Sequence, residues 1–164
     1  MNSLINRIWR NIICPALSLL PKDQRKAVCE SYAGRGFSDS PRAIAEELLN
    51  RGWKVYWLVK GPKEAESLPG GIKPLTIGST AAIYHMCTAG VWGRLYKRPS
   101  QRYVQTWHGF PLKRIEGDAE SALDAEYVRA ARKDSLMCDL FLSNSAFLTQ
   151  IYRRAFWYGG EVLE

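Results

Sequence analysis

Apolar positions along this chain of 164 residues follow two periods, one typical of strands and one typical of helices. Residues 53–59 form a short run rich in β-branched and aromatic side chains, and residues 40–49 carry apolar side chains three or four positions apart. By the same criteria, strands are predicted at 27–32, 53–59, 72–77, 88–92, 102–105, 139–143 and 160–164, and helices at 40–49, 79–86, 121–133 and 146–157. Because strands alternate with helices, the pattern predicts an α/β fold with a Rossmann-like parallel sheet flanked by helices.

Residues 1–22 follow a different pattern. Apolar side chains recur there at helical spacing with arginines between them: Leu4, Ile5, Ile8, Trp9, Ile12 and Ile13 alternate with Arg7 and Arg10. This pattern predicts an amphipathic basic helix that either docks on an anionic membrane surface or packs on the domain at 23–164. No apolar run reaches the length of a membrane-spanning helix, and no small-residue cleavage site supports a secretory signal.

Charge and cysteine content narrow the classes of partner. The formal net charge of +7 favours an anionic partner, such as a phosphate-rich substrate, an acidic lipid head group or a nucleic acid. The four cysteines lie far apart in the sequence, at Cys14, Cys29, Cys87 and Cys138, without a C-x-x-C pair or a histidine at metal-ligand spacing. We therefore expect buried, reduced thiols, which suit a reducing cytosol, rather than a disulfide framework or a zinc site.

The segment 105–113, with the sequence QTWHGFPLK, is the strongest candidate for chemistry. It places His108, one of only two histidines, at the carboxyl end of a predicted strand, where open α/β sheets bind ligands. Six basic residues and no acidic residue occupy the stretch 92–115: Arg94, Lys97, Arg98, Arg102, Lys113 and Arg114. We expect this positive field to attract phosphate and to favour a neutral imidazole that can accept a hydroxyl proton. The other histidine, His85, lies in an apolar predicted helix and is expected to be structural.

Two further segments have both a structural and a functional interpretation. The triplet Gly34-Arg35-Gly36 resembles half of a phosphate loop, with Asp39 where the third glycine would stand, so it predicts either a tight turn or an anion contact. Residues 143–145, Ser-Asn-Ser, are explained by capping of the next helix, and lining of an acceptor cleft is the alternative.

Residues 105–113 resemble the Q-T-W-H-G-x-P-L-K signature of the CDP-glycerol glycerophosphotransferases, the family of teichoic acid polymerases and primases. Residues 30–44 and 142–160 resemble further blocks of this family, so that the likeness spans roughly 27–164. Phe110 departs from the signature, because many relatives have threonine there. The resemblance implies that this chain is the N-terminal, acceptor-side half of a GT-B architecture. It would then end before the nucleotide-binding half.

The resemblance also implies an activity and its residues. Glycerol phosphate would pass from CDP-glycerol to a hydroxyl of a lipid-linked, polyanionic acceptor, with release of CMP, at the cytoplasmic face of the membrane. By this resemblance His108 would be the general base, and Gly109, Pro111 and Lys113 match the supporting positions of the motif. Gly109 would bind substrate, and from their charge we expect Lys113, Arg114 and Arg35 to hold its phosphates. No cofactor, metal ion or nucleic acid is expected, and the partner of this otherwise inactive half would be a missing C-terminal half or a second copy.

Two other functions stay open at this point. One is half of a sugar-nucleotide GT-B glycosyltransferase, which would keep the fold and change the donor. The other is a non-catalytic basic module that binds acidic membrane or nucleic acid, which is disfavoured because most aromatic residues fall inside predicted strands.

Overall fold

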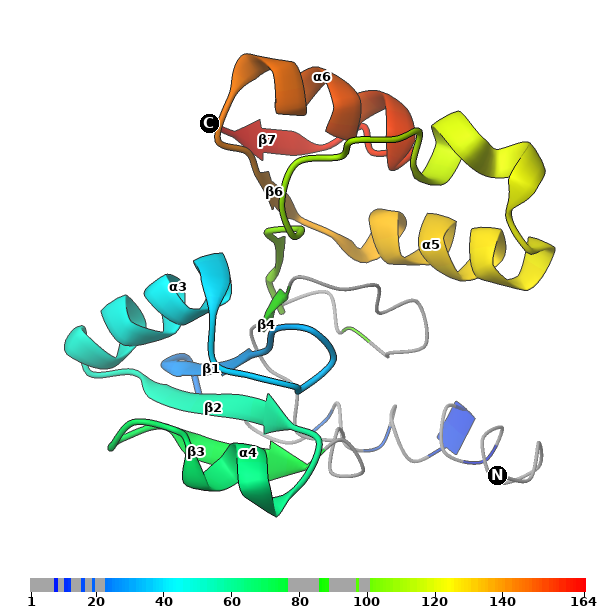
Figure 1. Ribbon diagram of the computed structural model, residues 1–164. Coiled ribbons are helices and arrows are strands. Elements are labelled where there is room, and N and C mark those ends of the chain that lie inside the picture. Colours follow the sequence, from blue (N-terminus) through cyan, green and yellow to red (C-terminus); the bar gives the residue numbers. More distant parts are fainter. Residues whose placement is uncertain are drawn as a thin grey trace.

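The computed structural model describes residues 23–76, 86–88, 97 and 101–164, together with the single positions 8, 11, 12, 16 and 19. Within these residues one parallel sheet has the strand order β3-β2-β1-β4-β5-β6-β7 (Figure 1). Its strands are β1 (Lys26–Cys29), β2 (Lys54–Val59), β3 (Lys73–Thr76), β4 (Met86–Thr88), β5 (Tyr103–Gln105), β6 (Leu140–Leu142) and β7 (Glu161–Leu163). The sheet confirms the predicted Rossmann-like α/β fold.

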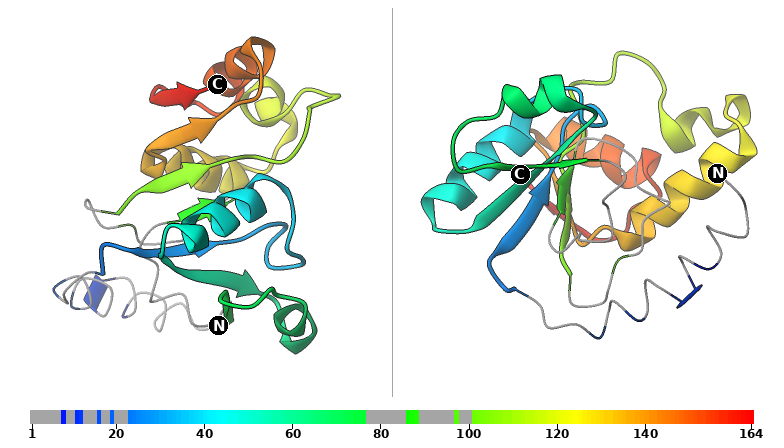
Figure 2. Two further views of the ribbon diagram at one scale, coloured as in Figure 1. Left: turned by 90° about the vertical axis from the view of Figure 1, so that its left-hand side faces the viewer. Right: turned by 90° about the horizontal axis from the view of Figure 1, so that it is seen from below.

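Helices cover both faces of this sheet. The described helices are α3 (Asp39–Asn50), α4 (Pro62–Glu66), the 3-10 helix η3 (Glu116–Ala122), α5 (Ala125–Met137) and α6 (Ala146–Ala155). Strands β2 and β3 lie on one side of β1, and strands β4, β5, β6 and β7 lie on the other. Because the chain winds in opposite directions on the two sides, right-handed crossovers place α3 and α4 on one face and α5 and α6 on the other. Figure 2 shows the two groups of helices on either side of the strands in its right-hand view.

Two apolar clusters hold the helices to the sheet. Under α3, the Trp57 side chain is fully buried and meets the Phe37 ring at 4.6 Å between centroids. Beneath α6, Phe141 of β6 packs on Tyr152 at 4.5 Å. Strands covered on both faces carry continuous apolar runs, which is why 54–59 reads as a strand without alternation. The expectation of buried thiols holds at Cys29, where burial raises the pKa to about 12.

Several boundaries differ from the predicted ones. Ser38 rather than Ser40 caps α3, because the Ser38 carbonyl already accepts a hydrogen bond from Arg42 N–H at 3.3 Å. Met86 belongs to strand β4, although the sequence pattern predicts the end of a helix there and a strand at 88–92. Helix α4 and most of η3 occupy stretches without a predicted element, and the helix predicted at 121–133 is observed as α5 at 125–137. The remainder of the predicted helix 79–86, with His85, lies outside the described residues.

The predicted amphipathic segment at 1–22 is described only at Ile8, Asn11, Ile12, Ala16 and Leu19. Two of its apolar positions, Ile8 and Ile12, are 42% and 62% exposed. In the described part of the chain, no helix combines the length and the apolar character needed to cross a membrane.

The strand order determines where a ligand site would lie. Strand β1 pairs with β2 on one side and with β4 on the other, so the direction in which the chain winds reverses at β1. In open parallel sheets such a switch point leaves a crevice at the carboxyl ends of the neighbouring strands. The loop after β1 and the loop after β5 both begin at this edge, and the second of them carries His108.

Candidate functional site

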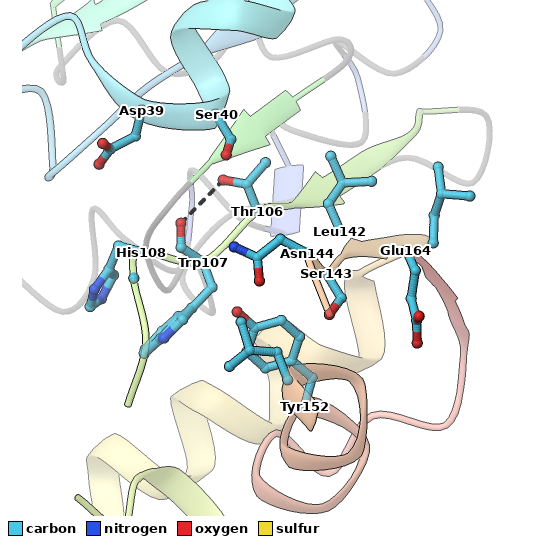
Figure 3. Close-up of a pocket in the computed structure, with 13 residues that line it drawn as sticks. Asp39, Ser40, Thr106, Trp107, His108, Leu142, Ser143, Asn144, Tyr152 and Glu164 are labelled. Carbon is cyan, nitrogen blue, oxygen red and sulfur yellow. Dashed lines mark hydrogen bonds between the residues drawn. The ribbon is translucent and has the colours of Figure 1, made fainter. Parts of the chain in front are cut away.

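A pocket of about 520 Å³ lies at the carboxyl edge of the sheet (Figure 3). It is formed by the start of α3 and by the segments that follow β5, β6 and β7. Its walls are made by Asp39, Ser40, Thr106, Trp107, His108, Gly109, Leu142, Ser143, Asn144, Leu148, Tyr152, Leu163 and Glu164. Figure 3 shows His108 and Asp39 at one end of this pocket and Glu164 at the other. Polar side chains at a strand edge suit a ligand with several hydrogen-bonding groups.

His108 is exposed and is supported from one side by aromatic rings. Its imidazole stacks on the Trp107 indole with ring centroids 4.1 Å apart and an interplanar angle of 24°. The indole is buried and in turn meets the Phe156 ring edge-on at 4.6 Å. The Tyr32 ring, from the loop after β1, lies 6.1 Å from the imidazole. The imidazole therefore stacks on a buried indole and stays accessible to solvent, as proton exchange with a ligand requires.

Several residues near His108 have a left-handed backbone conformation. Trp107 has φ 54°, Tyr32 has φ 46° and Asp39 has φ 58°, and Gly109 follows His108 with φ 80°. A left-handed backbone is unusual for non-glycine residues, and it is a clear outlier for a bulky aromatic. Such strain persists where surrounding contacts impose the conformation, and it concentrates at functional sites.

The charges near His108 differ from those expected. Lys97 and Arg102 do not face it: their side chains lie 2.9 and 3.6 Å from the carboxylate of Asp139, which precedes β6 at the opposite edge of the sheet. The prediction that these two residues contribute to a positive field around His108 is therefore wrong, because an acidic residue distant in sequence pairs with them. Arg94 and Arg98 lie outside the described residues.

Acidic groups approach His108 instead. Glu116 is 6% exposed, accepts a hydrogen bond from Tyr127 OH at 2.5 Å, and interacts electrostatically with His108. Burial raises the pKa of Glu116 above its usual value of 4.5, while the Tyr127 hydrogen bond and the charge of His108 act in the opposite direction. Asp39 lines the pocket, and its hydrogen bond with Tyr32 raises the pKa of that phenol.

The predicted substrate-binding residues are divided between the pocket and the surface. Gly109 lines the pocket. Lys113 and Arg114 are exposed on the loop that follows it, and Arg35 is exposed in the loop after β1, so none of these three cations belongs to the pocket wall that the structure describes.

The glycine triplet at 34–36 forms a tight turn. Gly34 has φ 77° and accepts a hydrogen bond from Lys60 N–H at 2.9 Å, and the Gly36 carbonyl accepts one from the Trp57 indole N–H at 2.9 Å. The turn thereby fixes the chain that leads into α3 and the pocket. This is the structural interpretation of the triplet.

Residues 143–145 confirm the predicted helix cap, and two of them also line the pocket. The Ser145 hydroxyl caps α6 by accepting a hydrogen bond from Leu148 N–H at 3.3 Å. Ser143 and Asn144 line the pocket, and Figure 3 shows both beside Thr106 and Trp107.

Sequence reasoning missed several residues of the site. Asp39 and Tyr152 line the pocket, and Tyr32 and Glu116 flank His108. Asp39 and Tyr32 fall within the block 30–44 that resembles the family, which was the available signal for them. Nothing in the spacing indicates Glu116 or Tyr152, because their placement depends on how η3 and α6 pack.

Comparison with known proteins identifies the family. A family model described as CDP-Glycerol:Poly(glycerophosphate) glycerophosphotransferase matches residues 12–164, and the chain therefore belongs to this family. The teichoic acid poly(glycerol phosphate) polymerase of Bacillus spizizenii is 29% identical over 178 residues, which cover 99% of this chain and 45% of the relative. The protein of the same name in Bacillus subtilis is 30% identical, with 99% of this chain and 24% of the relative covered.

Solved structures agree with this assignment. The wall teichoic acid polymerase TagF superposes with a TM-score of 0.78 and 25% identity, covering 98% of this chain and 44% of TagF. A histidine-to-asparagine variant of TagF soaked with CDPG gives the same values. The match confirms a fold like one half of a GT-B glycerophosphotransferase. The chain spans less than half of the length of these relatives.

Proposed function

We propose that this chain provides the acceptor side of a CDP-glycerol-dependent glycerophosphotransferase of teichoic acid synthesis, with His108 as the general base. The observation that carries the proposal is the placement of His108: an exposed imidazole, stacked on a buried tryptophan, at a polar pocket on the carboxyl edge of a switch-point sheet. Membership of the glycerophosphotransferase family supports the reaction class.

The proposed reaction is a transfer between oxygen atoms. The imidazole of His108 removes the proton from an acceptor hydroxyl while that oxygen attacks the phosphorus that carries glycerol in CDP-glycerol. A new P–O bond to the acceptor forms, the P–O–P bond to the cytidylate phosphate breaks, and CMP leaves with the electron pair of that bond. General-base assistance of this kind contributes about 10²–10⁴-fold in rate.

The acidic neighbour Glu116 fits the second stage of this step. When His108 takes the proton it becomes positively charged, and a carboxylate in electrostatic contact stabilises that charge. The cations expected to hold phosphate are Lys113, Arg114 and Arg35, which are exposed on the two loops that flank His108 and Tyr32. We assign them contacts with phosphates of the polyanionic acceptor.

Two further parts of the proposal concern the donor site and the N-terminal segment. Because the chain covers 44% of TagF, we assign most CDP-glycerol contacts to a second α/β half, and we expect the isolated chain to have little transferase activity. The exposed apolar positions Ile8 and Ile12 support a membrane-surface role for residues 1–22, with the domain at 23–164 acting on a lipid-linked acceptor.

Binding to the isolated chain tests this function without requiring turnover. In a His85→Gln background, His108 is the single histidine, so its imidazole NMR signals report on ligands at the pocket. We expect a glycerol phosphate oligomer to shift these signals, and we expect free glycerol not to do so. Equal responses to the oligomer and to glycerol, or no response to either, would contradict an acceptor site at His108. Binding of DNA with a similar response would favour the basic-module alternative.

A further inference from the structure

We infer that Asp134, Tyr103 and Gln105 form a buried hydrogen-bond chain that positions His108 by fixing the backbone of Trp107. These three are positioning residues, because they act through Trp107. That these hydrogen bonds fix the position of the His108 imidazole does not depend on the proposed function. Only an effect on turnover would rest on it.

The chain of hydrogen bonds is continuous from α5 to the site. Tyr103 OH donates to the Asp134 carboxylate, at 3.0 Å from Oδ2 and 3.2 Å from Oδ1. Gln105 Nε2 donates to the Tyr103 oxygen at 2.8 Å, and Trp107 N–H donates to Gln105 Oε1 at 3.0 Å. Tyr103, Gln105 and Asp134 are 4%, 3% and 5% exposed, so water does not compete for these groups.

The direction of each donor gives the chain its specificity. A tyrosine hydroxyl has one proton, and the Asp134 carboxylate accepts it, so the Tyr103 oxygen is left to accept from the Gln105 side chain. Burial and the charge of Asp134 raise the pKa of Tyr103 well above 10, which keeps this proton in place. The Gln105 amide must therefore present NH₂ to Tyr103 and its oxygen to Trp107 N–H. The reversed amide would set two donors against each other at Trp107.

Trp107 needs such support because its backbone is strained. Its φ of 54° is unfavourable for a bulky residue, and the conformation persists only where neighbouring groups impose it. Gln105 holds its N–H, the Thr106 hydroxyl donates to its carbonyl at 3.3 Å, and Phe156 packs on its ring. Since the His108 imidazole stacks on that ring at 4.1 Å, its position follows the Trp107 backbone.

The test uses the full chain in the His85→Gln background and measures the rate at which diethyl pyrocarbonate modifies His108. The variants are Gln105→Leu, Tyr103→Phe and the double variant. Tyr158→Phe is the matched control, because Tyr158 is 5% exposed and its hydroxyl donates to the Glu161 carbonyl at 3.0 Å, outside the hydrogen-bond chain that ends at Trp107 N–H. Rates are compared only under conditions in which each variant is folded, as judged by circular dichroism.

We expect each single variant to change the His108 rate by roughly fivefold, the shift produced by losing one ordinary buried hydrogen bond. The double variant should change it no further than the larger single effect, because both act through one N–H group. Unchanged rates in Tyr103→Phe, or an equal change in Tyr158→Phe, would reduce the chain to a stabilising feature and overturn the inference. If Gln105→Leu does not fold, Tyr103→Phe decides alone. The assay contains no donor or acceptor, so failure of the proposed function would leave its result standing.

Discussion

Replacement of Gly34 by alanine should destabilise the fold strongly, and the structure gives the size of the effect. Gly34 has φ 77°, and a Cβ atom there would lie 2.9 Å from Lys60 N and 3.0 Å from Val59 C, both backbone atoms of the chain leaving β2. The left-handed backbone costs about 1–2 kcal/mol for an L-residue, and a forced backbone shift adds about 1–3 kcal/mol. We therefore expect a loss of roughly 2–5 kcal/mol, a large part of the stability of an ordinary domain.

The assay is urea unfolding of the full chain followed by circular dichroism, with the free energy of unfolding taken from linear extrapolation. Gly52→Ala is the matched control, because Gly52 has φ 76° and a Cβ there meets nothing within 4 Å in the part of the chain that the structure describes. The control carries only the backbone cost, so the difference between the variants measures the contact with β2. Equal losses in both variants would refute the close approach of the Gly34 turn to β2.

Three further predictions follow from the site and the N-terminal segment. Burial raises the pKa of Glu116, so this residue holds a proton more tightly in the folded protein than in the unfolded chain, and the free energy of unfolding should fall as pH rises from about 4.5 through the folded pKa. Urea unfolding between pH 4 and 8 should show that Glu116→Gln removes this loss of stability. An unchanged pH dependence in this variant would contradict a buried Glu116 carboxyl. Deletion of residues 1–20 should weaken binding to anionic vesicles, with a dependence on salt, whereas unchanged sedimentation with vesicles would indicate a helix packed on the domain. The isolated chain should release little CMP from CDP-glycerol, and robust release in a coupled assay would show that it needs no second half.

Much of the architecture can be read from hydrophobic periodicity because parallel strands buried on both faces leave a strong local signal. Residues 54–59 and 140–142 are examples. The strand predicted at 102–105 is β5, at 103–105, and it places His108 just after its carboxyl end. The prediction of a helix end at Met86 was wrong because a short apolar run fits a helix or a strand, and pairing with β1 and β5 makes 86–88 extended. Thr88 lies in a strand as predicted, and residues 89–92 lie outside the described part of the chain.

The electrostatics of the site could not be predicted in the same way. A run of basic residues in the sequence does not indicate which acidic residues the fold brings close to it. Lys97 and Arg102 pair with Asp139 at the edge of the sheet opposite His108. The electrostatic interaction between Glu116 and His108 depends on where η3 packs. The left-handed φ of Trp107 has no signal in the sequence, because tryptophan does not favour that conformation. Local sequence therefore located the histidine, while the tertiary fold chose its partners.

The central claim is that His108 accepts the proton of the attacking hydroxyl. Its most direct test is acceptor-dependent CMP release by a chimera in which this chain replaces the matching part of the Bacillus spizizenii polymerase, with and without His108→Ala, and with His85→Gln as the control. We predict that His108→Ala lowers kcat by about 10²–10⁴-fold and leaves the affinity for CDP-glycerol nearly unchanged. His85→Gln should change kcat little. Turnover by the His108→Ala chimera close to that of its parent would contradict the account.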